Sequence, residues 1–296
     1  MFHLLYRFVK NKRLLFIEKK AAASCRTPNL RRVLEWCAVL GGLWLALLCG
    51  AGCLVNRLAF HPEKLDASWR PVQGEEIFFE DNGTRLHGIL LAAKEPRAVI
   101  VHCHGNAQSV KDWQWEGWRI RDALNVTVFI WDYPGFGKSE GRATPASVMS
   151  AGRAAVAAVA RHTGLPQEEI IVMGRSIGAA VAVDAACHAN AKALILESGF
   201  TSLRVMCQRV VRWLPWTWIL SEPMDSEKRI AAFQGPVFVA HGQRDSIVPF
   251  AHGERLFQTA VEPKGFYRGN GDHNDEWPDR YYKALEKFLT GQGVLK

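Results

Sequence analysis

The sequence has 296 residues, of which 48% are hydrophobic and 22% charged, a composition that excludes a disordered or low-complexity chain. Its formal net charge is +8, but residues 1–64 carry 11 Lys and Arg against 3 Asp and Glu, whereas the other 232 residues carry 26 of each. The basic charge therefore belongs to the N-terminal segment, and the rest of the chain has no net positive charge to attract a phosphate backbone, so we expect no nucleic-acid partner.

The first element in chain order is an apolar run at residues 36–55, which follows a basic tail at 1–35. Twenty residues without a charge are enough for a helix to span the roughly 30 Å hydrocarbon core of a bilayer. Arg31 and Arg32 directly precede the run, and more basic residues lie upstream. The positive-inside bias therefore predicts a transmembrane helix that places the rest of the chain on the extracytoplasmic side, periplasmic or lumenal.

A second interpretation of the same run remains open. Gly50-Ala51-Gly52-Cys53 is similar to the end of a lipoprotein signal, although such signals usually have a larger aliphatic residue at the place of Gly50. A cleaved signal peptide fits less well, because its apolar core is usually shorter. A retained helix and a lipidated Cys53 both predict that the membrane is a partner of this chain.

After a connector at residues 56–74, short apolar runs alternate with helical patterns up to residue 290. This alternation predicts one α/β domain at 75–290, with a mostly parallel eight-stranded sheet and helices on both faces. Asn82-Gly83 predicts a hairpin between the first two strands. The expected strands are 76–80, 86–92, 98–102, 126–131, 170–173, 193–197, 237–240 and 265–268. The expected helices are 108–124, 145–162, 177–189, 226–232, 251–260 and 279–290.

Residues 200–223 depart from the alternation and contain three tryptophans around a proline at 213–220. A segment of this kind either packs on the core as a helix or forms an apolar wall for an acyl chain beside the site. In the second interpretation, Trp213 and Trp216 contact the substrate.

Ser176 lies in Gly174-Arg175-Ser176-Ile177-Gly178, directly after the predicted strand 170–173 and before an alanine-rich helix. A serine on such a strand-to-helix turn has its hydroxyl exposed, and the two glycines leave room for the turn. A serine hydroxyl is a poor nucleophile at neutral pH, so it needs a base beside it. Arg175 either meets an anionic substrate or braces a neighbouring loop.

The two partners of such a serine follow in the chain as an acid and then a histidine. Asp245 comes after the strand 237–240, and His273 lies in a glycine-rich loop after the last strand. Both positions are at the carboxyl ends of strands, where the active sites of open α/β sheets form. We therefore expect His273 to take the proton of Ser176 and Asp245 to hold its imidazole.

A site of this type also needs donors for the oxyanion that forms on the substrate carbonyl. We expect the backbone N–H groups of Asn106 and Ile177 to supply them. His104 and Gly105 are expected to line the substrate site beside them, and Tyr133 either lines the floor of that site or braces its loops. The two histidines at 102 and 104 lack a third ligand with recognisable spacing, so the sequence predicts neither a metal nor any other cofactor.

Five motifs follow one another in the sequence: HisGlyAsnAla (104–107), AspTyrProGlyPheGlyLysSer (132–139), GlyArgSerIleGly (174–178), HisGlyGlnArgAsp (241–245) and GlyAspHisAsnAsp (271–275). Together they resemble the α/β-hydrolase family over roughly residues 75–290, and most of all its bud-emergence-suppressor-like branch. That branch includes eukaryotic depalmitoylases and bacterial membrane-tethered hydrolases. The resemblance implies an α/β-hydrolase fold, a triad of Ser176, Asp245 and His273, and ester or thioester hydrolysis. Asp272 departs from the pattern, because a small residue is commoner there, and we expect it to raise the local pKa or to compete as an acid.

The sequence therefore predicts a membrane-tethered serine hydrolase that acts on a small-molecule or lipidic acyl substrate. The same residues cleave amides in other enzymes, so an amidase or serine aminopeptidase is the nearest alternative. A catalytically silent hydrolase-fold protein that binds a partner is the alternative from another class. The chain has a nucleophile, an acid, a base and an oxyanion loop (the loop of His104, Gly105 and Asn106), and their presence together argues against it.

Overall fold

The computed structural model describes residues 59–210, 212 and 224–296, together with residues 39–42, 44, 46 and 50. The chain divides into two compact units, Met1–Ala51 and Gly52–Lys296, and the described residues of the first unit are helical. In the part of the chain that the structure describes, no helix has both the length and the hydropathy that a membrane crossing requires. The predicted tether at 36–55 lies largely outside that part, as do Trp213 and Trp216.

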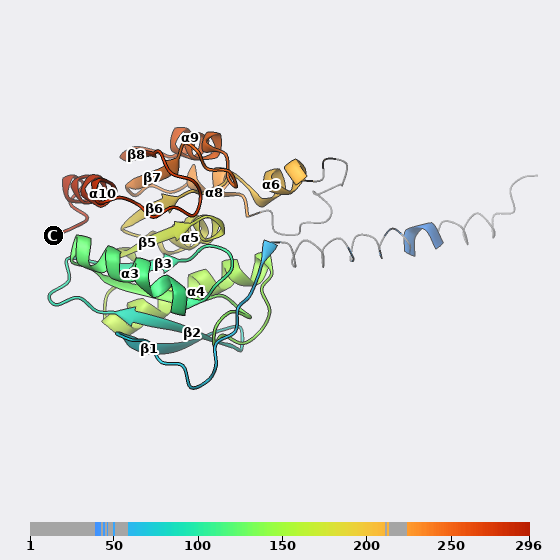
Figure 1. Ribbon diagram of the computed structural model, residues 1–296, viewed down its shortest axis with the longest axis horizontal. Coiled ribbons are helices and arrows are strands. Elements are labelled where there is room, and N and C mark those ends of the chain that lie inside the picture. Colours follow the sequence, from blue (N-terminus) through green and yellow to red (C-terminus); the bar gives the residue numbers. More distant parts are fainter. Residues whose placement is uncertain are drawn as a thin grey trace, which may run out of the picture. The chain divides into compact units, whose positions relative to one another are not determined.

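The second unit is built on one eight-stranded sheet, and all eight strands lie where the sequence predicts them (Figure 1). The strand order is β1-β2-β4-β3-β5-β6-β7-β8. β2 pairs antiparallel with β1 and with β4, and all other neighbours are parallel, which gives the mixed, mostly parallel sheet that was expected. The strands are β1 (Glu75–Asp81), β2 (Thr84–Leu91), β3 (Val99–Cys103), β4 (Thr127–Asp132), β5 (Ile170–Arg175), β6 (Ala193–Glu197), β7 (Val237–Gly242) and β8 (Lys264–Gly269).

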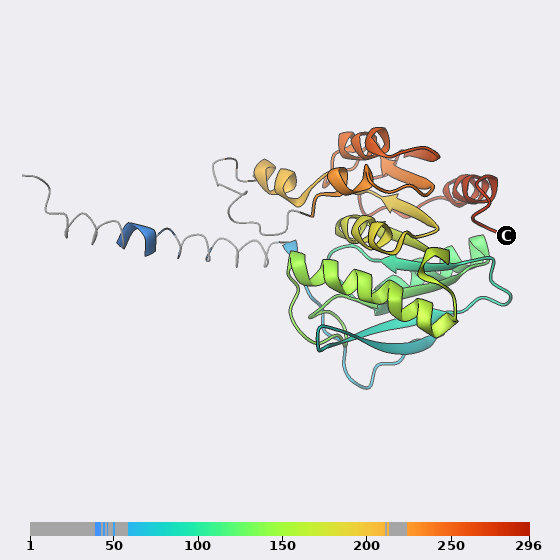
Figure 2. The same ribbon diagram turned by 180° about the vertical axis from the view of Figure 1, so that it is seen from behind.

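Helices cover both faces of this sheet (Figures 1 and 2). α3 and α10 contribute to one hydrophobic core, whereas α4, α5, α8 and α9 contribute to the core on the opposite face. The bounds are α3 (Val110–Leu124), α4 (Pro145–Thr163), α5 (Ile177–Ala189), α6 (Leu203–Val210), α8 (Ser226–Ile230), α9 (Phe250–Thr259) and α10 (Asp279–Gly291), with a 3₁₀ turn, η1 (Gln167–Glu169), before β5.

The β1–β2 hairpin turns at the residues that the sequence indicates. Asn82 and Gly83 have φ angles of 48° and 76°. A two-residue turn with both φ angles positive matches the right-handed twist of the strands that it joins, and asparagine and glycine adopt that conformation most easily. The register pairs Asp81 with Thr84 directly across the turn.

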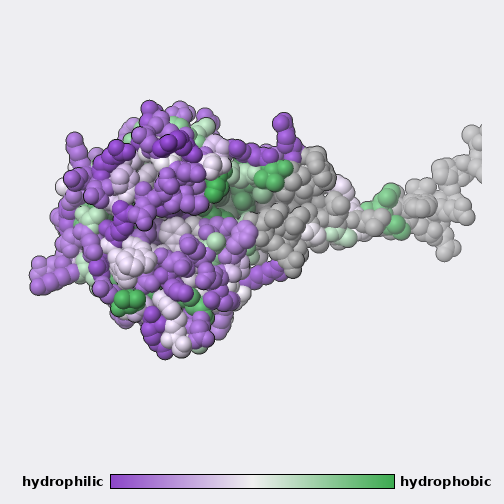
Figure 3. Space-filling model, in the orientation of Figure 1, coloured by the Kyte–Doolittle hydropathy of each residue, from purple (hydrophilic) through white to green (hydrophobic). Residues whose placement is uncertain are grey.

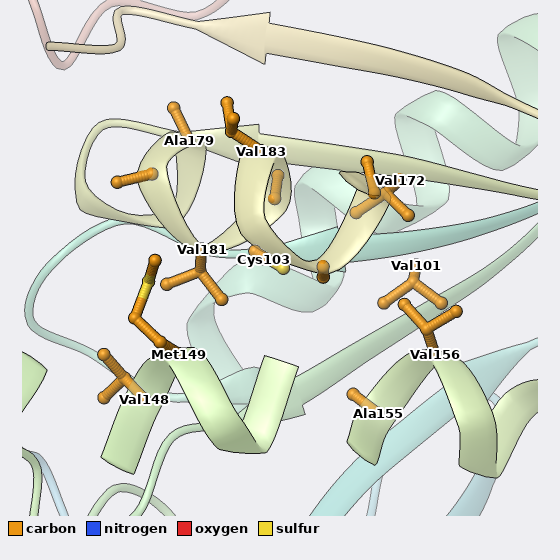
Figure 4. Packing of buried hydrophobic residues seen from close by; sticks show 14 of the residues in the cluster. Val101, Cys103, Val148, Met149, Ala155, Val156, Val172, Ala179, Val181 and Val183 are labelled. Atoms are coloured by element: carbon orange, nitrogen blue, oxygen red, sulfur yellow. The ribbon is translucent and has the colours of Figure 1, made fainter. Parts of the chain in front are cut away.

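The central strands are buried on both faces, because a parallel sheet covered by helices leaves neither face to solvent. Every residue of β3, β5 and β6 is buried. Figure 4 shows one side of this core, where Val101 and Val172 of the sheet pack with side chains of α4 and α5. The two helices approach closely, since a Cβ at Gly152 would lie 2.5 Å from a methyl group of Val181. This packing fixes α5, and with it the turn that connects β5 to α5.

Candidate active site

Ser176 occupies the turn between β5 and α5 in a conformation that few residues other than glycine adopt. Its φ is 56° and its ψ is −118°. The backbone N–H of Ser176 donates to the Glu197 carbonyl oxygen at the end of β6, with a distance of 2.9 Å. A strained backbone persists only where its surroundings hold it, and such positions gather at functional sites.

Two glycines make the turn possible, as the sequence predicts. A Cβ on Gly174 would come within 2.1 Å of the carbonyl oxygen of Gly178. A Cβ on Gly178 would come within 2.1 Å of the Cys103 carbonyl oxygen and within 2.4 Å of that of His104. The backbones of β5, α5 and the loop after β3 therefore approach too closely for any side chain at these two positions.

His273 connects the serine to a carboxylate. Its Nε2 lies 2.9 Å from Ser176 Oγ, and its Nδ1 lies 2.8 Å from Asp245 Oδ2. The three residues come from the loops after β5, β7 and β8, and the histidine is only 6% exposed. The structure thus brings together the serine, acid and histidine singled out in the sequence. With Nδ1–H donating to Asp245, Nε2 is left to accept the serine proton.

Asp245 is held ionised in this position. Its Oδ1 accepts hydrogen bonds from the backbone N–H groups of Ile247 and Val248, at 3.0 and 2.7 Å. Burial alone raises the pKa of the Asp245 carboxyl, but hydrogen bonds from His241, then from His273 and Val248, outweigh this effect. The pKa of Asp245 is therefore well below its usual value, and the carboxylate stays charged beside His273.

Two further side chains fasten the His273 loop. Arg175 is 7% exposed, and its Nη2 donates to the carbonyl oxygens of His273 and Asp275, at 2.9 Å each. The carboxylate of Asp272 accepts from the N–H and the hydroxyl of Ser246, so it joins the histidine loop to the loop of Asp245. Of the two roles open for Arg175, the structure shows the brace. Asp272 fastens two loops and does not take the place of the acid.

The loop after β3 lies against the first turn of α5. This contact follows from Gly178, whose missing Cβ leaves room for the carbonyl groups of Cys103 and His104. Ile177 is the first residue of α5, where helix geometry leaves an N–H without an intrahelical acceptor. Asn106 lies two residues beyond His104 in the same loop. The predicted oxyanion donors therefore belong to two segments that touch each other beside Ser176.

Comparison with known proteins places this arrangement in a family. Residues 94–226 match the family model described as serine aminopeptidase, S33. The uncharacterized protein Rv2307c of Mycobacterium tuberculosis is 35% identical over 202 residues, which cover 67% of this chain and 71% of that protein. YfhR of Escherichia coli is 29% identical over 245 residues, which cover 77% and 84%. Human alpha/beta hydrolase domain-containing protein 17B is 29% identical over 200 residues, which cover 66% and 67%.

Solved structures share the fold. An esterase of Pyrococcus furiosus matches with a TM-score of 0.63 at 16% identity, over 79% of this chain and 98% of the esterase. Est1E of Butyrivibrio proteoclasticus, solved with ferulic acid bound, matches with a TM-score of 0.59 at 18% identity, over 74% and 99%.

The chain belongs to the α/β-hydrolase family.

In this α/β-hydrolase, two residues considered for the substrate site are packed inside the protein. His104 and Tyr133 are both fully buried, with their rings 4.2 Å apart. The Tyr133 hydroxyl donates to the His104 carbonyl oxygen at 2.5 Å, and His104 Nδ1 lies 2.6 Å from the Gly105 carbonyl oxygen. Both side chains therefore support the loop after β3 from within the core, and neither has a surface open to solvent. Gly105 is buried in the loop itself, against Trp113.

The two histidines at 102 and 104 are both fully buried. Among the residues that the structure describes, no group of three or more His, Cys, Asp or Glu is placed to hold an ion. Burial, followed by the nearby charges of His104 and Arg175, lowers the pKa of His102 to about 3. The ring of His102 is therefore neutral at physiological pH. The structure gives no partner for its two nitrogens.

Glu197 is a buried acid beside Ser176, and sequence reasoning missed it. Its carbonyl holds Ser176, and its fully buried carboxylate accepts a hydrogen bond from the Tyr281 hydroxyl at 2.5 Å. Burial and the neighbouring Glu116 raise the pKa of Glu197 to about 7, against the opposing effects of Arg175 and Tyr281. No signal in the sequence marks Glu197, because a strand that ends in glutamate is common and its burial depends on α10.

We expect Glu197→Gln to change the pH dependence of stability. The folded protein binds a proton at Glu197 more tightly than the unfolded chain, whose ordinary pKa is 4.5. Stabilisation is therefore lost as the pH rises from about 4.5 through about 7. Thermal unfolding between pH 5 and 8 should show a smaller decline of Tm for Glu197→Gln than for the wild type. A parallel decline in the two proteins would contradict the raised pKa. Glu63→Gln, at an exposed position, is the control.

Proposed function

We propose that this α/β-hydrolase cleaves carboxylic ester or thioester bonds through an acyl-enzyme on Ser176. The observation that carries the proposal is the pair of contacts at His273, which lies 2.9 Å from Ser176 Oγ and 2.8 Å from Asp245 Oδ2. A serine hydroxyl becomes an effective nucleophile when a base of this geometry accepts its proton and a third group orients the base.

In the first half of the reaction, Ser176 Oγ attacks the substrate carbonyl carbon while its proton passes to His273 Nε2. The carbonyl oxygen becomes an oxyanion, which accepts hydrogen bonds from the N–H groups of Ile177 and Asn106. Asp245 stabilises the imidazolium that has formed. The intermediate then collapses, the bond to the alcohol or thiol breaks, and His273 gives its proton to the leaving group.

In the second half, water takes the place of the leaving group. The water oxygen attacks the acyl carbon on Ser176 while His273 accepts a proton from the water. The same two N–H groups stabilise the second oxyanion. The bond to Ser176 Oγ breaks, the carboxylic acid leaves, and the serine recovers its proton from His273, so that the enzyme returns to its first state.

An apolar surface beside the site supports an acyl chain as part of the substrate. α6 follows the carboxyl end of β6, the edge of the sheet at which Ser176 lies. Its residues Val205 and Val210 are 40% and 79% exposed, and Figure 3 shows hydrophobic residues gathered at this helix on an otherwise largely hydrophilic face. We therefore assign a lipidic or amphiphilic ester as the substrate class. The esterase Est1E, a structural relative, binds the aromatic acid ferulic acid.

A membrane location completes the proposal. The uncharged run 36–55 and the basic residues before it support a tether that leaves residues 75–290 on the extracytoplasmic side. A tether would keep Ser176 near lipidic substrates, which partition into the bilayer and its surface.

The nucleophile is tested with a fluorophosphonate probe on the full chain. We expect the wild type to be labelled, and Ser176→Ala to lose labelling and at least about 10³-fold in kcat, because the triad acts as a unit. Ser68→Ala, which changes an exposed serine of the connector, is the control and should match the wild type. Labelling that persists in Ser176→Ala would refute Ser176 as the nucleophile.

The bond type is tested with p-nitrophenyl esters of increasing chain length against aminoacyl anilides. The apolar face of α6 predicts a kcat/KM that rises with acyl length, and ester cleavage faster than anilide cleavage. Val210→Asp should reduce the preference for long chains and change acetate hydrolysis far less, since an acetyl group has little apolar surface to place against α6. Faster cleavage of anilides would instead favour the aminopeptidase activity that the matching family model describes.

The tether is tested by fractionation and by intact mass. We expect the full chain to stay with membranes through alkaline carbonate extraction, and a variant without residues 1–55 to be released. A retained helix leaves the mass of the complete chain, 33.1 kDa, whereas lipidated Cys53 requires loss of residues 1–52 and addition of a diacylglycerol. Full release of the complete chain by carbonate would overturn the proposed location.

A further inference from the structure

The side chain of Asn106 joins the oxyanion loop to the connector that follows the N-terminal segment. Its Oδ1 accepts hydrogen bonds from the backbone N–H of Ala107, at 2.9 Å, and from the backbone N–H of His61, at 3.1 Å. Its Nδ2 donates to His61 Nδ1 at 3.0 Å. Asn106 and His61 are 45 residues apart in the sequence, so this paired contact is a product of the tertiary fold.

The loop at Asn106 has a backbone that needs such support. Ala107 and Gln108, the next two residues, have φ angles of 62° and 65°, and neither is a glycine. Two successive left-handed residues with side chains are costly and persist only where the surroundings fix them. The Oδ1 atom of Asn106 fixes the first of them directly, and His61 fixes the orientation of Asn106.

His61 is exposed, but the chain is anchored on both sides of it. Its neighbour Phe60 is 3% exposed and belongs to the core that α4 and α5 form. On its other side, the Glu63 carbonyl accepts from the N–H of Gly137 at 2.7 Å, and the N–H of Leu65 donates to the Gly137 carbonyl at 3.1 Å. The connector therefore acts as a fixed support at His61, anchored on both sides of that residue.

The segment after β4, to which the connector is paired at Gly137, supports the oxyanion loop at a second point. Tyr133, four residues before Gly137, donates its hydroxyl hydrogen to the carbonyl oxygen of His104. The loop is thus held at His104 by the segment that starts after β4, and at Asn106 by the connector paired to that segment. Gly105 lies between the two points, in a space where a Cβ would come within 2.9 Å of the Trp113 ring.

We propose that His61, through the side chain of Asn106, positions the Asn106 N–H for the oxyanion, so that the connector completes the active site. His61 is a positioning residue, because it acts on the substrate only through Asn106. The inference rests on the proposed function and adds a link between the segment that precedes the domain and the chemistry at Ser176.

The contact is tested with a double-mutant cycle in the full chain. Asn106→Ala keeps the N–H donor but removes its support, so we expect kcat for a p-nitrophenyl ester to fall about 10- to 100-fold, less than the 10²–10³-fold typical of a donor lost outright. His61→Ala removes only the imidazole and should lower kcat about 3- to 10-fold, within the range of one coupled contact. The double variant should be no slower than Asn106→Ala alone. KM should change little in any of them.

A second measurement separates positioning from a general loss of structure. Replacing the carbonyl oxygen of the ester by sulfur gives a larger and weaker acceptor, which a well-placed pair of N–H groups discriminates against. We expect the ratio of kcat/KM for the oxygen ester over the thionoester to fall in both single variants. Glu63→Ala, which alters an exposed side chain of the same connector, should keep the wild-type ratio. Concentrations of active enzyme are set by fluorophosphonate titration, so unfolded protein does not enter kcat.

An unchanged kcat and an unchanged ester ratio in Asn106→Ala would overturn the inference, as would single effects that add in the double variant. These outcomes differ from a failure of the proposed function. In that case Ser176→Ala would keep its activity, or the wild type would take up no probe, whatever residue stands at 61 or 106.

Discussion

The close approach of three backbones at the β5–α5 turn is the constraint on which the rest of the site depends. Gly174 and Gly178 have no room for a Cβ, because the carbonyl groups of Gly178, Cys103 and His104 occupy that space. The turn between them forces Ser176 to a positive φ. One tight contact therefore sets the conformation of Ser176 and holds the loop after β3 against the first turn of α5.

The loops that reach this turn hold one another. They end neighbouring parallel strands, so they meet at one edge of the sheet, but strand order alone does not fix them to hydrogen-bond precision. That precision comes from polar contacts between loops: Arg175 to the His273 loop, Asp272 to Ser246, and Asn106 to His61. Each contact ends on backbone groups, so it fixes the path of a loop as well as a side chain. A site held in this way is preorganised before the substrate arrives.

Two buried carboxylates near Ser176 have very different pKa values, because they receive different numbers of hydrogen bonds. Asp245 accepts enough hydrogen bonds to stay charged despite its burial, whereas Glu197 lacks such compensation and faces Glu116. Both are carboxylates at the ends of adjacent strands. The number of donors that each receives, a property of the surrounding loops, decides which of them is ionised more easily.

The sequence by itself determined the order of the strands along the chain, the β1–β2 hairpin and the identity of Ser176, Asp245 and His273 as a group. These features follow from local patterns: apolar runs, turn residues, and motifs at strand ends. Only the tertiary structure decided that the His104 side chain is buried and that Tyr133, of its two possible roles, braces the loop after β3. It alone revealed His61, because a histidine in a connector carries no local sign of a partner 45 residues away. Contacts between distant loops depend on how the whole sheet packs, and no local pattern encodes them.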